Sequence, residues 1–353
     1  MAKDVKVVIS LAKPVTGTGF GYPLIFEGKA TTFIDYTECY DIDDVIKAVG
    51  KITDSDDEET VATKTATAKE SNIYKAALLI FMQDNAPEKI AVYATSSSAT
   101  TGLAALMHHG WRQVIVTSVG VEGEDTRKAI SDYIETTEKM YFTSVEKALN
   151  LSGQSAISGN ERTVIMCHDD DNTLITFPEA ALVGVAASKV AGSFTYKNLM
   201  LKGLTPKVLS DSQINEIHNA NAMAFVLKCG DGVTSEGKTT SGEYIDIIDA
   251  KDYIIQNIEY QTQKLLNQSD KIPYDNSGIA RLETVCVNVL RDAANNGLIA
   301  LTDEGVYDYS VSYKARSETK GADRAERKYV EGSFRFALAG AIHTVEIKGT
   351  IEI

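Results

Sequence analysis

The chain has 353 residues, of which 44% are hydrophobic and 24% charged, and this composition excludes the disordered and fibrous classes. A formal charge of −14 argues against general nucleic-acid binding, because such binding depends on basic side chains that neutralise phosphates. The length exceeds the size at which one hydrophobic core usually stops growing, so we expect two or more domains.

No apolar run approaches the roughly 20 residues of a membrane helix, and the N-terminus lacks the pattern of a secretory signal. We therefore expect a protein made in the cytoplasm, without membrane insertion. The four cysteines form no CxxC pair, which favours reduced, mostly buried thiols. They are Cys39, Cys167, Cys229 and Cys286.

The N-terminal residues predict a β-strand, because apolar side chains alternate along it. Those side chains are Val5, Val7, Ile9 and Leu11. Residues 13–28 are dense in Gly and Pro and predict a turn-rich connector. Its GTGFG sequence is not a GxGxxG motif, so a plain loop is favoured over a phosphate-binding loop.

Residues 42–49 and about 69–82 predict helices, and residues 54–59 an acidic, solvated loop. From about residue 88, short apolar runs alternate with helical segments, which predicts a mostly parallel sheet with covering helices. Such sheets often bind ligands at their strand ends, so this region supplies an enzyme hypothesis.

Beyond residue 200 the alternation ends. Ser210 or Asp211 can cap a short helix that ends at Ala220, and a hairpin is expected around Gly230–Gly232. Two long helices are expected over about 246–268 and 277–296, the second ending at Gly297.

The last residues predict another strand with one apolar face. Its inward positions are Val345, Ile347, Ile351 and Ile353. Chain ends normally fray unless something holds them. A terminal strand of this length therefore needs a partner sheet, which another copy of the chain can supply. The segment Ala339–Gly340–Ala341 before it is small enough to act as a hinge.

Three polar clusters are candidate sites of chemistry. Residues 167–171 (CHDDD) have neither EF-hand spacing nor a paired-His motif, so a solvated turn is favoured over a metal site. Ser96–Ser98 lack a G-x-S-x-G context, which favours helix capping over nucleophilic catalysis. His108 and His109 favour a helix C-terminus over a metal pair. We expect no catalytic residue, metal or cofactor.

Residues 314–328 carry a net positive charge in an otherwise acidic chain, with six basic side chains against three acidic ones. The plain interpretation is a solvated helix, and the functional one is a patch facing an acidic surface. The candidate residues are Lys314, Arg316, Arg324, Arg327 and Lys328.

Three segments of the C-terminal third, in order, carry a resemblance to a known family: GEYIDIIDAKDYIIQNI, KIPYDNSGIARLETVCVNVLRDAANNGLIA and ADRAERKYVEGSFRFALAGAIHTVEIKGTIEI. They resemble the C-terminal domain of contractile phage tail sheath proteins, most nearly the short sheaths of phage-like bacteriocins and defective prophages of Gram-positive bacteria. The N-terminal strand, the GTGFG loop and PLIFEG also fit that group. The similarity is specific over about 240–353, fair over 1–85 and weak between.

The resemblance implies a structural subunit that polymerises as stacked six-membered rings around an inner tube and contracts to drive the tube through a target cell envelope. The implied fold class is α/β: an α+β inner sheath domain with terminal β-strand arms, plus an inserted α/β domain. The expected division is an N-terminal arm (1–20), the inner domain (21–85 and 201–338), an outer α/β domain (86–200) and a C-terminal arm (339–353).

The resemblance also implies partners and a location. The partners would be other copies of the chain through exchanged strands, a tail tube protein that the basic stretch would face, and baseplate and terminator proteins. The product would be an extracellular phage tail or tail-like particle released by lysis. Two alternatives stay open: a cytoplasmic α/β enzyme, and a non-contractile tail or shell protein.

Overall fold

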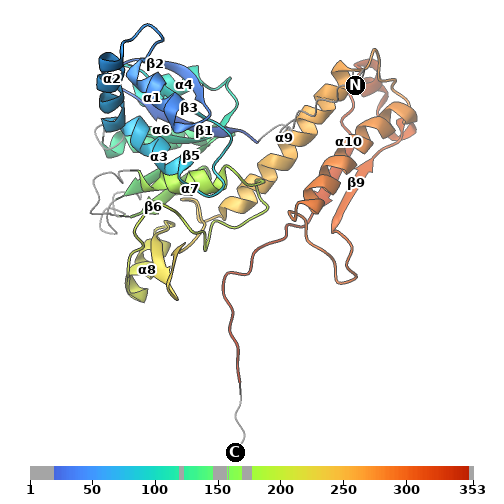
Figure 1. The fold of residues 1–353 in the computed structure, drawn as a ribbon. Helices are drawn as coiled ribbons and strands as arrows, with labels where there is room; N and C mark the ends of the chain where they lie inside the picture. Colours follow the sequence, from blue (N-terminus) through green and yellow to red (C-terminus); the bar gives the residue numbers. More distant parts are fainter. Residues whose placement is uncertain (1–19, 119–122, 146–156, 158, 169–176, 350–353) are drawn as a thin grey trace, which may run out of the picture.

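A computed structural model describes residues 20–118, 123–145, 157, 159–168 and 177–349. Figure 1 shows a broad α/β domain and an elongated C-terminal domain connected by one long helix, α9 (Ile245–Asn267). Within the described ranges, no helix has the length and apolar character of a membrane span.

The α/β domain is built on a six-stranded sheet in the order β2-β3-β1-β4-β5-β6. Its strands are parallel except β2, which pairs antiparallel with β3 at one edge. The strands are β1 (Tyr22–Glu27), β2 (Ile34–Cys39), β3 (Ile90–Ala94), β4 (Trp111–Val116), β5 (Met140–Val145) and β6 (Thr163–Cys167). The predicted mostly parallel sheet is thus confirmed.

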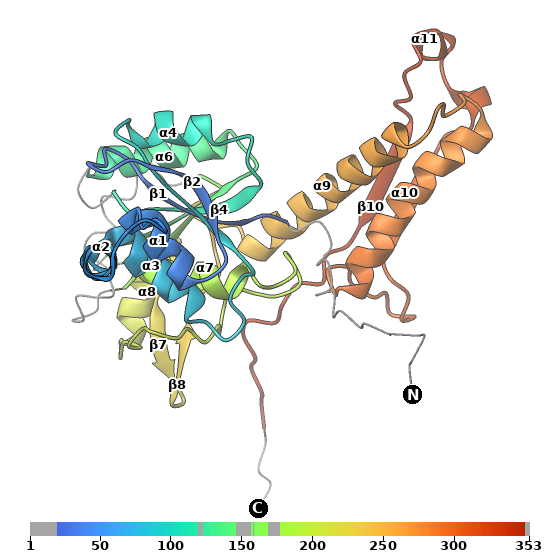
Figure 2. The same ribbon diagram turned by 45° about the horizontal axis from the view of Figure 1, so that its top comes forward.

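Helices cover both faces of this sheet (Figure 2). Along β1, Leu24 and Phe26 point into a core with α4 (Ala99–Ala105) and α6 (Glu124–Glu135), and Ile25 points into the opposite core. That second core is lined by α1 (Ile42–Gly50), α3 (Asn72–Phe81) and α7 (Pro178–Ala186). Helix α2 (Glu58–Glu70) packs on α1 and α3.

A small lobe extends the α/β domain beyond β6. It contains α8 (Asp211–Asn219) and the hairpin of β7 (Phe225–Lys228) and β8 (Asp231–Thr234). Ser210 caps α8 with a capping box, and Cys229 and Gly230 take the positive φ of a tight hairpin turn. The expected helix and hairpin are therefore present. The lobe shares a core with β5 and β6.

The C-terminal domain pairs α9 with α10 (Asn276–Asn295) and packs them on a two-stranded antiparallel sheet, β9 (Tyr309–Tyr313) and β10 (Gly332–Phe336). Asp275 caps α10 by accepting the N–H of Gly278 at 3.0 Å, and Gly297 follows the helix with a φ of +80°. Both long helices agree with the sequence prediction. The 3₁₀ turn η2 (Arg316–Glu318) and α11 (Gly321–Ala325) connect the strands.

The structure corrects two parts of the sequence interpretation. The expected connector over 13–28 contains β1, which is hydrogen-bonded between β3 and β4 at the centre of the sheet. A domain boundary at residues 85/86 would cut through this sheet, so 21–85 and 86–200 are not separate units. Residues 201–244 also pack on the α/β domain, and the C-terminal domain begins within α9.

We predict that Ile25→Ala lowers the free energy of unfolding by about 2–5 kcal/mol, because it leaves a cavity in the central strand. Ile25 is fully buried. Chemical denaturation measures the change, and Phe33→Ala, at an exposed position beside the same sheet, is the matched control. Equal stabilities for the two variants would contradict the central position of β1.

Candidate functional site

Helix α9 belongs to both hydrophobic cores. Ile245 and Ile248 pack in the core of the α/β domain, and Ile254 packs in the core of the C-terminal domain. A continuous helix is stiff over this distance, so the orientation of the two domains depends on how the first turns of α9 are held.

Buried ion pairs hold those turns. Arg112, at the start of β4, contacts Asp249 at 2.8 Å and Asp252 at 2.9 Å. Arg162 donates two hydrogen bonds to Asp252, at 2.6 and 3.1 Å. The hydroxyl of Tyr196 donates to Asp249 at 2.8 Å. We call this group the junction network; both aspartates come from α9 and both arginines from the sheet domain.

Burial and the neighbouring arginines shift the pKa of Asp252 in opposite directions. Burial favours the neutral carboxyl, but the hydrogen bonds from Arg162 and the charge of Arg112 outweigh it and lower the pKa of Asp252. The carboxylate is therefore ionised at neutral pH. Buried pairs of this kind contribute little net stability over an apolar contact, but removing one partner is costly and their geometry fixes a register.

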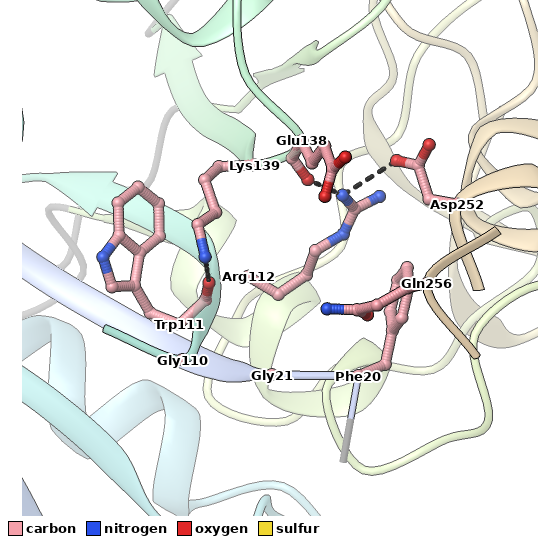
Figure 3. A pocket seen from close by; sticks show the side chains of 9 residues that line it. All are labelled: Phe20, Gly21, Gly110, Trp111, Arg112, Glu138, Lys139, Asp252 and Gln256. Carbon is pink, nitrogen blue, oxygen red and sulfur yellow. Dashed lines mark hydrogen bonds and ion pairs between the residues drawn. The ribbon is translucent and has the colours of Figure 1, made fainter. Parts of the chain in front are cut away.

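A small pocket lies beside the junction network (Figure 3). The ring of Phe20 covers the Arg112 guanidinium at 4.5 Å and lies 5.8 Å from the ring of Tyr253. Gly21 has a φ of +107°, and a Cβ there would lie 2.6 Å from the Cβ of Arg112. The pocket has a volume of about 110 Å³, well below the roughly 300–1,000 Å³ of small-molecule sites. The arrangement is suited to holding Phe20 and to orienting the two domains.

Lys139 adds a second cation at the rim of this pocket. Its ammonium donates to the carbonyl oxygens of Trp111 and of His109. Burial, together with the charge of Arg112, lowers the pKa of Lys139 to about 8. The amine therefore stays mostly protonated at neutral pH, held by backbone oxygens.

The three polar clusters have different outcomes. Ser98 caps α4, accepting the N–H of Thr101 at 3.5 Å, as expected. His109 follows α4 and stacks on Tyr36 at 3.7 Å between ring centroids. The prediction of a solvated turn is wrong at His168, whose side chain is buried (4% exposed) and packs against Phe225. Residues 169–171 of the same cluster lie outside the described ranges. Over the part of the chain that the structure describes, no His, Cys, Asp and Glu side chains cluster as a metal site.

The described part of the predicted C-terminal strand, residues 345–349, pairs with no other described strand. Residues 341–349 are neither helix nor strand, and the end of this segment runs away from both domains in Figure 1. Val345 is 72% exposed and Ile347 88% exposed. Ile351 and Ile353 lie beyond the described residues, as do Val5, Val7, Ile9 and Leu11 at the other end.

The basic stretch, residues 314–328, forms the end of the C-terminal domain that lies farthest from the α/β domain (Figure 2). Lys314 pairs with Glu331 at 2.5 Å. The guanidinium of Arg324 donates to the carbonyl oxygens of Arg316 and Thr319, so Arg324 holds the loop. The side chains of Arg316, Arg327 and Lys328 are exposed.

We predict that Asp252→Asn lowers the free energy of unfolding by about 3–5 kcal/mol at pH 7, because the buried guanidinium of Arg112 and the half-buried one of Arg162 lose their shared anion. Asp132→Asn, at an exposed pair with Lys128, is the matched control, with an expected change of about 1 kcal/mol or less.

The difference between Asp252→Asn and the native protein should shrink in acid. A lowered pKa in the folded state gives stability that is complete above the ordinary carboxyl pKa of about 4 and is lost as the pH falls through the folded value. Denaturation at pH 7, 5 and 3 measures this. A difference that stays constant over that range would contradict an ionised Asp252 in the network.

Comparisons with known proteins bear on this architecture. A protein-family model described as "E217 tail sheath protein gp31-like, C-terminal domain" matches residues 245–351. No curated protein matches the sequence.

Three solved structures share the fold over essentially the whole chain. A chain of the anti-feeding prophage (AFP) baseplate matches with a TM-score of 0.70 and 14% identity, over 100% of both chains. The AFP helical sheath in the contracted state gives 0.69 and 14%, over 99% of both. The contracted PVC sheath complex of an extracellular contractile injection system gives 0.68 and 11%, over 100% of this chain and 98% of the other. Residues 245–351 therefore match the C-terminal domain of tail sheath proteins, and the chain as a whole has the fold of the contractile tail sheath family.

Proposed function

We propose that the chain is a structural subunit of a contractile tail sheath. Its subunits would form six-membered rings stacked around an inner tube, and contraction would drive the tube through a target envelope. The observation that carries this proposal is the likeness to a contracted sheath subunit over 99% of both chains, including the C-terminal domain that the family model matches separately.

The terminal segments would connect the subunits. The sequence alternates apolar residues from Val345 onward, and of these the described Val345 and Ile347 are exposed to water, in a stretch (345–349) that belongs to no strand. Adding such a strand to a sheet of another copy satisfies the backbone and buries the apolar face. The two-stranded sheet of β9 and β10 is a candidate acceptor, since it can take a further strand at an edge.

The two domains would take different positions in the particle. The C-terminal domain, with its basic tip, would face the tube, and the α/β domain would lie outside it. Baseplate and terminator proteins would close the polymer. We assign the particle to a phage tail or headless bacteriocin of the kind found with Gram-positive hosts, assembled in the bacterial cytoplasm and released by lysis.

The proposal assigns no reaction to the chain. The likeness extends over the whole length of structural sheath subunits, and the junction pocket is small for a substrate. Both observations favour a sheath over the cytoplasmic α/β enzyme that a parallel sheet alone would allow. The contracted state of two of the similar assemblies favours a contractile particle over a static tail or shell protein.

The first test removes residues 345–353. Because Val345 and Ile347 lie outside both cores, the truncated subunit should stay soluble and keep its melting temperature within about 2 °C, but it should not form cylinders. Ile347→Pro keeps the strand and removes one backbone donor, so it should also block polymerisation. Ile347→Val is the matched control. Normal cylinders of Ile347→Pro in electron micrographs, or an unfolded truncated subunit, would contradict strand exchange.

The second test reverses the charge of the basic tip. Arg327→Glu with Lys328→Glu should weaken co-sedimentation with the tube protein at low salt, and added salt should weaken the native contact in the same way. Arg324 is left unchanged because it holds the loop. A control with Lys69→Glu and Lys189→Glu makes the same charge change at exposed sites on the α/β domain. Equal co-sedimentation of the two double variants with the tube protein would contradict the proposal that the basic tip faces the tube.

A further inference from the structure

One side chain in the C-terminal segment is held by the body of the subunit. The His343 side chain is 14% exposed, whereas Ile342 is 83% and Val345 72% exposed. Among residues 340–349 it is the only one that is not exposed. The polar imidazole is thus packed against the protein while its apolar neighbours face water. The hydrophobic effect alone would bury the apolar side chains instead, so specific contacts must hold the imidazole.

The contacts of His343 come from three segments outside its own. Its Nε2 lies 2.9 Å from the hydroxyl of Thr195, and its Nδ1 lies 3.5 Å from a carboxylate oxygen of Glu236. The ring packs edge-on against Tyr244, the residue before α9, at 4.9 Å between centroids. All three partners belong to the α/β domain or to its connection with α9.

Neighbouring groups hold the two polar partners of His343 in place. The Thr195 hydroxyl oxygen accepts the backbone N–H of Lys197 at 3.3 Å, and the same hydroxyl exchanges a hydrogen bond with Nε2 of His343. The Glu236 carboxylate accepts the N–H of Gly237 at 3.1 Å and lies 3.8 Å from the ammonium of Lys197. The imidazole therefore packs into a site whose polar groups are held by contacts of their own.

A second tie lies four residues earlier. The N–H of Ala339 donates to the carbonyl of Leu298 at 2.9 Å, which fixes that residue to the C-terminal domain. Between Ala339 and His343 the chain crosses from one domain to the other, and after His343 it leaves both (Figures 1 and 2). Segment 339–341, the expected hinge, is therefore held on both sides.

We propose that His343 is a positioning residue that sets where the C-terminal arm leaves the subunit. This inference rests on the proposed exchange of that arm. The pivot of the arm lies at Thr344 and beyond, and Ala339–Gly340–Ala341 cannot redirect it while His343 is bound. Fixing the exit point lowers the conformational entropy that the arm loses when it docks on a neighbouring copy.

The test measures the arm in the unassembled subunit. Spin labels are placed at Glu346→Cys and Lys189→Cys after Cys229→Ser, because Cys229 is the one exposed cysteine and Cys39, Cys167 and Cys286 are buried. His343→Ala should at least double the width of the distance distribution and leave the melting temperature within about 2 °C. Ile342→Ala, an exposed neighbour, is the control and should change neither. Thr195→Val should widen the distribution like His343→Ala, and the double variant should add nothing further.

Unlabelled variants then test assembly. His343→Ala should reduce the pelleted polymer at least fivefold at equal concentration, with His343→Gln intermediate because its amide can still bond to Thr195. A distance distribution for His343→Ala as narrow as that of the native subunit overturns the proposal, as does one no wider than that of Ile342→Ala. The failure of arm exchange itself would be distinguishable, because the subunit lacking residues 345–353 would then still polymerise while the spin-label result stood.

Discussion

Burial of charge on the first turns of α9 constrains the rest of the subunit. Two aspartates of this helix are taken out of water: Arg112 of the α/β domain pairs with both, and Arg162 pairs with Asp252 as well. A shift of α9 by one residue would turn the aspartates by about 100° away from those arginines and leave charges buried without partners. The register of α9, and with it the orientation of the whole C-terminal domain, is therefore specified by electrostatics more sharply than apolar contacts alone would allow.

The same junction holds Phe20, the first described residue, and His343 of the C-terminal segment. Phe20 rests on the Arg112 guanidinium and near Tyr253, at the start of the described chain, and His343 rests on Tyr244. Domain orientation and arm exit are thus determined by one stretch of α9 and the residue before it. In the proposed sheath, a change that disturbed this stretch would alter the internal geometry and the external connections together.

The sequence predicted elements with local signals and missed those defined by distant partners. The long helices were found because their apolar stripes end at recognisable caps, Asp275 before α10 and Gly297 after it. Strand β1 was missed because its flanks are rich in Gly and Pro, and a short apolar run has no period of its own. Its central place is decided by β3 and β4, which come some 60 residues or more later in the chain. Helix α2 was not predicted, because Ala68 is its one buried residue and the helix therefore has no apolar stripe in the sequence.

The junction network could not be predicted from local sequence patterns either, since Arg112 and Asp249 are 137 residues apart in the chain. A signal did exist: Asp249 and Asp252 lie three residues apart among the apolar residues of a predicted helix, where solvated charges are not expected. Charged residues inside an apolar stripe indicate a buried partner, although the sequence does not say which one. The domain boundary was misplaced for a related reason, because it was drawn from a family resemblance and not from pairing within the sheet.

A rigid junction has a consequence for how the proposed sheath would store and release free energy. Cores and buried ion pairs are costly to rearrange, so the large motions of contraction would be taken up where such contacts are absent. In this subunit that place is the chain beyond His343, which has exposed apolar side chains and no partner strand among the residues described. The free-energy difference between extended and contracted lattices would then come from contacts between subunits, with the arms preserving connectivity. A subunit that deformed internally would instead have to break the pairs at Asp252 and reform them, a step that costs several kcal/mol with nothing in the junction to offset it.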